Sequence, residues 1–392
     1  MHFERVAIEA IGFTLPTEVI RSVDIEHSLA PTYSRLGLPE GRLELMSGIS
    51  ERRFWPRGTP VSGPSVESAR RVLEASRIAP DRIGCLIHAS VCRDYLEPAT
   101  ACRVHAELGL GTDCWVHDLS NACLGLLSGM VQIATLIEMQ EICAGIVVGT
   151  ESSRNLVEST VHALNADSSL TRRTIKPSFA SLTIGSASCA ILLVDRRLSQ
   201  TDNRLLHAVA RARTHHHQLC QSDQDQAGSA MQPLMQTDSE QLLHAGVAVG
   251  VETFEAFKRQ GQTAPDATVC HQVGGTHRKL MLDALDLPLA NDFSTFQWLG
   301  NTGSVALPTA LAMGLRCGKL KAGQSIALLG IGSGINSVMM ATRWQHPIVV
   351  GDLDANACGH LGIVQPLTTS SQRHDGAHSI SAAHQPKHVV VG

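Results

Sequence analysis

The side chain best placed for chemistry is the thiol of Cys123, which lies near the start of the stretch NACLGLLSGMVQIATLIE. This stretch is apolar around nearly its whole circumference, which predicts a central, buried helix over residues 121–138. Cys123 would then occupy the first turn, with Ser120 and Asn121 as N-cap candidates. Unpaired backbone N–H groups and the positive end of the helix dipole favour thiolate, the nucleophilic form of cysteine. The alternative is one more small buried hydrophobe among eleven cysteines.

Three further side chains have types that could take part in acid–base or electrostatic chemistry. His271 ends an apolar, strand-like run, Asn301 lies in a Gly-Asn pair, and Glu97 precedes Pro98 in RDYLEP. Taken alone, each has an ordinary explanation, because histidines at strand ends are often structural, Gly-Asn favours turns, and loop carboxylates are usually solvated. The residue types therefore do not decide between structural and functional roles.

Two other patterns resemble ligand-binding motifs, one for a nucleotide and one for a metal ion, but their details argue against binding. The loop GIGSG (330–334) is followed by INSVMMAT (335–342), which alternates like a strand, whereas a dinucleotide fingerprint requires a helix there. We therefore expect strand, loop and strand, and no nucleotide cofactor. His215, His216 and His217 are consecutive, so they do not converge on one ion, and we predict a surface tract and no metal site.

Composition narrows the class of protein. Of 392 residues, 43% are hydrophobic, which excludes global disorder, and only 4% are aromatic, so small aliphatic side chains must fill the core. Lys and Arg total 32 against 36 Asp and Glu, which argues against nucleic-acid binding. No apolar run is long enough for a membrane helix, and no secretory signal is visible. The eleven cysteines form no C-x-x-C pair and predict reduced thiols in the cytoplasm.

The elements that must position these residues follow from the hydrophobic pattern. Short apolar runs alternate with longer amphipathic stretches, which predicts an α/β fold with mostly parallel sheets buried on both faces. The predicted strands are residues 5–11, 84–90, 143–149, 188–194, 205–212, 267–272, 325–330 and 335–342. The predicted helices are residues 65–78, 100–109, 121–138, 239–260, 276–285 and 304–316.

The two halves of the chain share one rhythm of elements. This predicts a pseudo-duplication, with residues 1–200 carrying Cys123 and residues 201–344 carrying His271 and Asn301, joined near 195–203. The polar segment 214–238 is expected to be an exposed insertion. Residues 345–392 contain six of the 19 histidines and are expected to form an extension outside the packed domain.

Several segments resemble the thiolase superfamily, specifically β-ketoacyl-acyl carrier protein synthase III and its relatives. NACLGLLSGM resembles the nucleophile segment, and GISERRFW (48–55) resembles the N-terminal signature. CHQVGGTHRKL (270–280) resembles the His-Gln segment, GNTGSVALPTALAMG (300–314) the Gly-Asn segment, and SIALLGIGSGIN (325–336) the closing hairpin. The resemblance covers residues 1–344 and implies a five-layered αβαβα fold with two pseudo-duplicated halves, working as a homodimer.

The resemblance also assigns roles. It implies that Cys123 carries the acyl chain as a thioester, and that His271 and Asn301 stabilise the enolate of the second substrate. It implies an oxyanion hole made by the backbone N–H groups of Cys123 and Ser333. The family usually has glycine at the position of Ser333, where serine has more restricted backbone angles, so this assignment stays open.

The branch of closest resemblance is the head-to-head condensing enzymes of bacterial long-chain olefin synthesis. SVCRDYLEPATA (90–101), the HQV form of the histidine motif and LLGIGSG (328–334) resemble that branch. Synthase III enzymes usually have Asn three residues after the histidine, where this chain has Gly274. In the olefin branch, a glutamate in the same RDYLEP sequence context as Glu97 reaches across the dimer interface and removes the α-proton of an ordinary acyl thioester.

The resemblance therefore implies an acyltransferase that performs a Claisen condensation of two fatty acyl-CoAs to a 2-alkyl-3-ketoacyl-CoA, without a metal or redox cofactor. One alternative is a decarboxylative synthase III that uses malonyl-carrier protein in fatty acid biosynthesis, which needs no base. Another is a non-catalytic acyl-binding subunit, against which the retained Cys, His and Asn speak. Arg278 and Lys279 could meet the phosphates of coenzyme A or an acidic acyl carrier protein, or simply form a solvated helix face.

Overall fold

The strands form two sets, one from each half of the chain, and both sets follow the same order from the middle of the molecule outward. The structure is a computed structural model that describes residues 1–222, 234–261 and 264–363. In the first half the order is β1 (Val6–Thr14), β7 (Ala187–Asp195), β6 (Ala144–Glu151), β4 (Cys85–Ala89) and β5 (Trp115–Leu119). In the second half it is β8 (Arg204–Ala212), β13 (Asn336–Arg343), β12 (Ser325–Gly332) and β11 (Ala267–Cys270). β1 and β8 meet at one pair of residues, Ala7 and Arg204, which joins the two sets.

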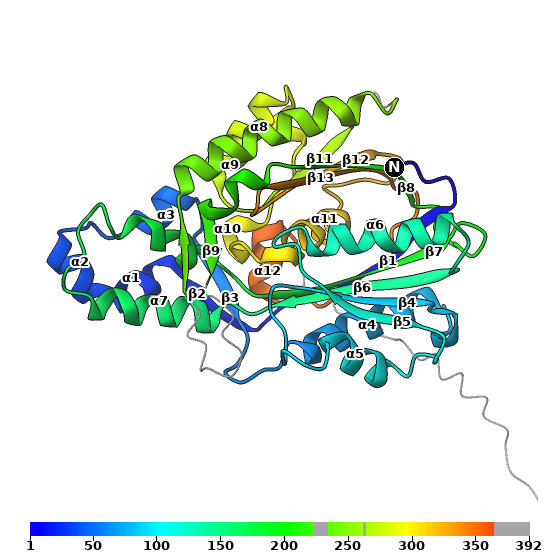
Figure 1. The fold of residues 1–392 in the computed structure, drawn as a ribbon, viewed down its shortest axis with the longest axis horizontal. Coiled ribbons are helices and arrows are strands. Elements are labelled where there is room, and N and C mark those ends of the chain that lie inside the picture. The colour runs from blue at the N-terminus through cyan, green and yellow to red at the C-terminus, as the bar shows by residue number, and fades with distance from the viewer. Residues whose placement is uncertain (223–233, 262–263, 364–392) are drawn as a thin grey trace, which may run out of the picture.

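Helices lie above, between and below these two sets of strands (Figure 1). The central layer contains α6 (Gly125–Glu138) and α11 (Ala306–Arg316). The outer face of the second set is covered by α8 (Ser239–Lys258) and α9 (Gly275–Ala284), and that of the first set by α4 (Ser62–Ser76) and α5 (Thr100–Leu108). The fold is therefore the expected five-layered αβαβα arrangement, in which α6 and α11 occupy equivalent positions in the two halves.

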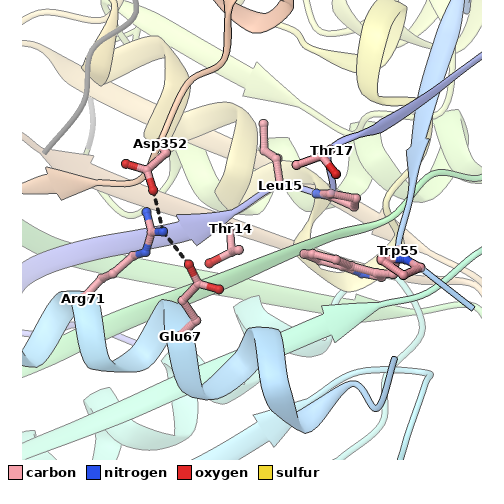
Figure 2. A pocket seen from close by; sticks show the side chains of 9 residues that line it. Thr14, Leu15, Thr17, Trp55, Glu67, Arg71 and Asp352 are labelled. Carbon is pink, nitrogen blue, oxygen red and sulfur yellow. Dashed lines mark hydrogen bonds and ion pairs between the residues drawn. The ribbon is translucent and has the colours of Figure 1, made fainter. Parts of the chain in front are cut away.

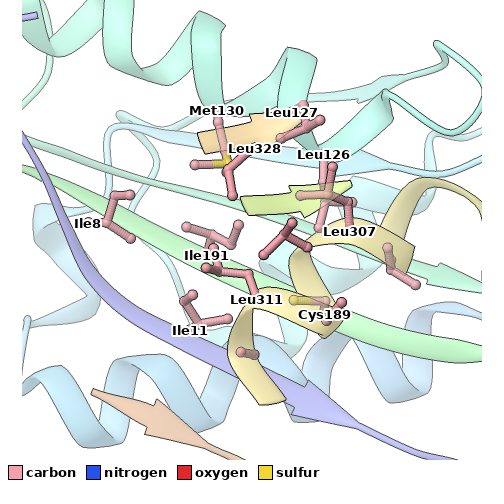
Figure 3. Close-up of a cluster of buried hydrophobic side chains, with 14 of the residues drawn as sticks. Ile8, Ile11, Leu126, Leu127, Met130, Cys189, Ile191, Leu307, Leu311 and Leu328 are labelled. Carbon is pink, nitrogen blue, oxygen red and sulfur yellow. The ribbon is translucent and has the colours of Figure 1, made fainter. Parts of the chain in front are cut away.

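Alternating side chains of the central strands fill different layers of the core. Ile191 of β7 packs with α6 and α11 between the sheets, whereas its neighbour Leu192 packs against α4 on the outer side. Leu328 and Leu329 of β12 divide in the same way between the central core and the outer layer of α8 and α9. Figure 3 shows the central cluster, where side chains from both halves meet. Burial on both faces explains why the strands read as continuous apolar runs.

The sheet is mixed, so the expectation of mostly parallel pairing is wrong. β4 pairs in parallel with β5 and β6, and β11 pairs in parallel with β12. The closing strand of each half, β7 or β13, runs antiparallel to both of its neighbours. The apolar runs were correctly read as strands covered by helices on both faces, but this burial does not depend on strand direction.

A lobe beside the five layers contains elements that periodicity did not indicate. Its members pack around their own apolar cluster, which includes Ile25, Leu43, Phe54 and Leu164. Apart from α7, these elements are short, which explains why they carry little periodic signal. They are α1 (Ser22–Ser28), α2 (Ala30–Leu36), α3 (Arg42–Ser47), α7 (Arg154–Ala166), the 3-10 segment Lys176–Thr183, and the ribbon of β2 (Glu18–Arg21) and β3 (Glu51–Phe54).

The segment expected to be an exposed insertion is partly ordered. Residues Thr214–Leu219 form a 3-10 turn, and β9 (Cys220–Ser222) pairs with β10 (Met235–Thr237). His215 and His217 are exposed, as expected of a surface tract. The part of the segment over 223–233 lies outside the described residues.

The first part of the expected C-terminal extension packs into the domain, which corrects the expectation of an appendage for residues 345–363. β14 (Val349–Val350) pairs with β1, and α12 (Ala355–Leu361) adds Ala357 and Cys358 to the central core. Apolar side chains within this polar stretch drive that packing. Residues 364–392 lie outside the described part of the chain.

Ion pairs also tie this segment to the first half. Arg53 binds Asp354 at 2.6 Å. Figure 2 shows Asp352 and Glu67 directed at Arg71, at 2.7 and 2.5 Å, on the margin of a cavity of about 330 Å³. Within the described residues, no helix is both long enough and apolar enough to cross a bilayer.

Truncating the central helix α11 should weaken the whole fold. Leu311 is fully buried in the cluster between the sheets. Leu311→Ala is expected to lower the free energy of unfolding by about 3 kcal/mol, because it removes buried methyl groups and leaves a cavity. Urea unfolding followed by circular dichroism measures this change. Leu45→Ala on α3, where the side chain is 86% exposed, is the control, and an equal loss in both variants would contradict the layer assignment.

Candidate active site

Cys123 lies in a tight turn between β5 and α6. Leu124 N–H donates to Asn121 O at 2.9 Å, Gly125 N–H donates to Ala122 O at 3.3 Å, and Ala122 has a φ of 44°. Because of this turn the helix begins at Gly125, not at 121, and no side chain among the described residues caps it. The predicted caps Ser120 and Asn121 are therefore wrong, and Cys123 precedes the first turn of the helix. The Asn121 side chain instead donates to Ser128 Oγ.

The side chain of Asn301 lies beside the thiol of Cys123 and acts to lower its pKa. Asn301 follows α10 (Phe296–Leu299) and precedes the 3-10 turn that leads into α11. Its backbone N–H donates to Thr183 O at 3.0 Å, and its Oδ1 accepts from Gly303 N at 3.0 Å. With the oxygen bound to a backbone donor, the amide nitrogen faces the thiol. Two residues 178 positions apart in the numbering thus meet at the starts of the two central helices.

The resting thiol of Cys123 is protonated at neutral pH, contrary to the expectation of a thiolate. Burial is the largest cause that raises its pKa, to about 12, and the charges of Glu151 and Cys220 add to the rise. The hydrogen bond from Asn301 opposes it. Because α6 begins only after Cys123, the favourable effect of a helix start does not outweigh burial.

His271 directly follows β11 and is 5% exposed. Its backbone N–H donates to Leu329 O at 3.1 Å, which holds it beside β12. Burial lowers the pKa of the imidazole to about 3, with a smaller contribution from His277. The ring is therefore neutral at physiological pH and able to donate or accept one hydrogen bond from each nitrogen according to its tautomer.

The backbone of Cys270, just before His271, is held at both of its polar groups. Cys270 N–H donates to Asp292 Oδ1 at 2.9 Å, and its carbonyl accepts from Gln272 Nε2 at 2.5 Å. The side-chain oxygen of Gln272, Oε1, in turn accepts from Thr295 N at 2.8 Å. These bonds fix the backbone at the end of β11, and therefore the position from which the His271 side chain extends.

Arg278, a candidate for phosphate binding, is engaged inside the protein. Its Nε donates to Asp292 Oδ2 at 2.6 Å and its Nη2 to the Asp292 carbonyl at 2.6 Å. The guanidinium thereby braces Asp292, which in turn holds the end of β11. Arg278 is therefore neither a free phosphate ligand nor part of a solvated helix face, which were the two predictions from the sequence. Lys279 is exposed on α9.

Ser333 lies in the turn of the β12–β13 hairpin, which confirms strand, loop and strand over this glycine-rich segment. The turn abuts the nucleophile segment, because a Cβ on Gly332 would come within 2.9 Å of Leu124 Cγ. Gly334, not Ser333, has the positive φ, 132°. Serine at 333 is thus compatible with the turn, and its backbone N–H remains a candidate for the oxyanion hole.

Glu97 is exposed in the loop that follows β4, next to Tyr95 and Leu96, which are 62% and 53% exposed. Within one chain, the carboxylate that acts on the Cys123 thiol is Glu151 at the end of β6, not Glu97. The structure thus brings Cys123 and Asn301 into contact, places His271 and Ser333 on neighbouring strand ends, and leaves Glu97 facing outward.

Two residues of the site were missed from the sequence. Glu151 is 4% exposed and its only signal was an acidic residue just after an apolar strand. The ring of His277 meets that of His271 edge-on at 5.6 Å, and its signal was a histidine six positions later on the predicted helix. Among the described residues, no three His, Cys, Asp or Glu side chains are grouped so as to hold a metal ion.

Comparisons with known proteins agree with this geometry. Residues 261–344 match the C-terminal family of 3-oxoacyl-[acyl-carrier-protein] synthase III. The chain is 39% identical over 351 residues to the acyl-CoA:acyl-CoA alkyltransferase of Shewanella oneidensis, an alignment that covers 88% of this chain and 100% of the relative. The β-ketoacyl-[acyl-carrier-protein] synthase III of Koribacter versatilis is 24% identical over 87% of this chain and 98% of its own length.

A solved structure of Xanthomonas campestris OleA superposes with a TM-score of 0.82 at 32% identity, covering 88% of this chain and 98% of that chain. The acyl-CoA:acyl-CoA alkyltransferase of the same organism is 32% identical over 88% of this chain and 100% of its own length. With the thiol, the carboxamide and the five layers in place, the chain belongs to the acyl-CoA:acyl-CoA alkyltransferase family of thiolase-fold acyltransferases.

Proposed function

We propose that this protein condenses two fatty acyl-CoA molecules, without decarboxylation, to a 2-alkyl-3-ketoacyl-CoA. The observation that carries the proposal is the contact between the Cys123 sulfur and the Asn301 carboxamide in a chain of this family. Such a contact provides a nucleophile and, beside it, a hydrogen-bond donor for a developing oxyanion.

In the first step the Cys123 sulfur attacks the thioester carbonyl of one acyl-CoA. The carbonyl oxygen becomes an oxyanion, which the backbone N–H groups of Cys123 and Ser333 stabilise. Collapse of this intermediate releases free coenzyme A, which takes the thiol proton, and leaves the acyl chain on the sulfur. The high pKa of Cys123 means that this proton leaves during the attack, not before it.

In the second step another acyl-CoA loses its α-proton to Glu97 of the partner subunit. The enolate oxygen is held by His271 and Asn301, and the carbanion attacks the acyl group on Cys123. Formation of the new carbon–carbon bond expels the Cys123 sulfur as a thiolate. This thiolate takes up the proton that Glu97 removed, so both groups return to their resting states and the product leaves as a 2-alkyl-3-ketoacyl-CoA. Lauric acid and lauroyl-CoA bound to the Xanthomonas campestris enzyme support a fatty acyl substrate of this kind.

A homodimer explains why Glu97 faces outward. β5 is the last strand at its edge of the sheet, and Trp115 on it is 59% exposed, so a second copy can pair there. The loop that carries Glu97 and the turn that carries Cys123 both leave from the paired ends of β4 and β5, Ala89 and Leu119. In solved variants of the Xanthomonas campestris enzyme, the replaced glutamate and cysteine are separated by as many residues as Glu97 and Cys123.

The alternative substrate for the second step is malonyl-carrier protein, as in fatty acid biosynthesis. The match of residues 261–344 to synthase III favours it, and an acyl carrier protein would then be a partner. Loss of carbon dioxide would supply the carbanion, and Glu97 would not be needed as a base.

The eleven free thiols fit a protein that works in the reducing cytoplasm.

Cys123→Ala should abolish covalent acylation. Mass spectrometry of the intact chain after incubation with lauroyl-CoA is expected to show one added acyl group on the wild-type protein and none on the variant. Cys102→Ala, which removes an exposed thiol, is the matched control and should be acylated like wild type. Acylation of the Cys123→Ala chain would contradict the nucleophile assignment, and absence of acylation in wild type would favour a non-catalytic acyl-binding subunit.

Glu97→Gln separates the two second steps. It should reduce condensation of two acyl-CoAs at least 100-fold while leaving acylation of Cys123 intact, because only proton removal is lost. Mixing this variant with Cys123→Ala and allowing the subunits to exchange should restore up to about a quarter of the wild-type rate, since half of the dimers would then hold one complete site. Full activity of Glu97→Gln with a malonyl thioester would instead support the decarboxylative reaction.

The high pKa of Cys123 predicts the pH dependence of its alkylation. Because only the thiolate reacts and its pKa is raised to about 12, the rate with iodoacetamide should rise about tenfold per pH unit from pH 7 to 9.5 without a plateau. Peptide mapping over time at each pH measures the rate at Cys123, with exposed Cys102 as an internal reference. A plateau at Cys123 near neutral pH would mean a stabilised thiolate.

A further inference from the structure

Glu151 is an acidic residue that the proposed reaction does not use, although it belongs to the surroundings of Cys123. It ends β6, is 4% exposed, and acts electrostatically on the Cys123 thiol. A carboxylate buried this deeply next to a nucleophile needs partners that compensate for its desolvation. Its partners come from two segments far apart in the sequence.

The first partner segment is the turn that carries Asn301. Glu151 Oε1 accepts from Ser304 Oγ at 2.6 Å and from Ser304 N at 3.2 Å. Gly303 closes over the carboxylate, because a Cβ added there would lie 3.0 Å from Glu151 Cγ, at a φ of 56° that already favours glycine. Ser304 Oγ also lies 3.0 Å from the carbonyl of Ala89, the last residue of β4.

The second partner segment is the start of the loop that carries Glu97. Val91 N–H donates to Glu151 Oε1 at 3.1 Å, and Cys92 N–H lies 3.4 Å from Oε2. One carboxylate thus accepts from the loop after β4 and from the turn before α11. The same loop leads to the proposed base, and the same turn carries the amide that contacts the sulfur.

We propose that Glu151 is a positioning residue, which locks the Asn301 turn and the Glu97 loop to each other beside Cys123 and keeps a negative charge next to the resting thiol. The inference rests on the proposed function, because it concerns the geometry of the same site. The charge disfavours a free thiolate between turnovers, and the hydrogen bonds set where the carboxamide and the base loop stand when the substrates arrive.

Glu151→Gln removes the charge and keeps the shape of the side chain. The rate of iodoacetamide alkylation at Cys123 should rise about tenfold at each pH from 7 to 9.5, because a nearby like charge no longer opposes the thiolate. The kcat of condensation should fall about tenfold with KM for acyl-CoA little changed, since positioning is lost and substrate contacts are not. Glu141→Gln, at an exposed glutamate after α6, is the matched control and should behave like wild type in both measurements.

Ser304→Ala separates the hydrogen bonds from the charge. It keeps the carboxylate, so the alkylation profile of Cys123 should stay at its wild-type position while condensation slows. If Glu151→Gln does not fold, as judged by circular dichroism, Ser304→Ala still tests the positioning role, and a wild-type kcat in that variant would overturn it.

An unchanged alkylation profile together with an unchanged kcat in Glu151→Gln would overturn the inference. The alkylation measurement needs no acyl-CoA, so it stands even if the wild-type chain does not condense acyl groups. Failure of the proposed function would instead appear as absence of acylation in wild type, and the two failures are therefore distinguishable.

Discussion

The pairing of the Cys123 thiol with the Asn301 side chain is the interaction on which the site depends. Its two partners come from different halves of the chain, and they meet only if both sheets and the central helix layer pack in register. Apolar contacts of residues such as Leu126 and Leu307 hold that layer together. Burial of aliphatic side chains therefore sets the geometry of a polar contact at its edge.

The same burial controls the chemistry of the ionisable groups. It raises the pKa of the Cys123 thiol and lowers that of His271, so both groups are neutral at rest. A site without fixed charge on the nucleophile or the imidazole suits a reaction in which negative charge develops on substrate oxygen, since the donors need not compete with an ion pair. Asp292, which would add charge near His271, is instead paired with Arg278.

Much of this arrangement could be predicted from the sequence. The eight predicted strands and six predicted helices all occur, because each is a continuous apolar or amphipathic run, and the duplicated order of the halves followed from their rhythm. Within the candidate site, Cys123 was singled out from its place near a predicted helix start, and Asn301 from the family resemblance. The resemblance supplied His271, Ser333 and Glu97, which periodicity alone would not have distinguished from ordinary strand-end and loop residues.

The sequence misled where tertiary context decides. The predicted strand direction was wrong because apolar runs indicate burial and not the direction of a strand relative to its neighbours. The predicted start of α6 was wrong because the turn at Ala122 cannot be recognised from residue type. The prediction of a thiolate at Cys123 followed from that error. Arg278 was read as free because its partner Asp292 lies in another segment. Glu151 escaped notice because its donors, Ser304 and Val91, are far away in the sequence.

The equivalent positions of α6 and α11 have an evolutionary consequence. The sulfur stands immediately before one of these helices and the carboxamide before the other, so the two halves contribute matching corners to a single site. An ancestor with one half would have needed two copies to bring such corners together, and both corners would have been chemically identical. Fusion of two such copies would allow them to diverge, so that one corner holds a thiol and the other a carboxamide.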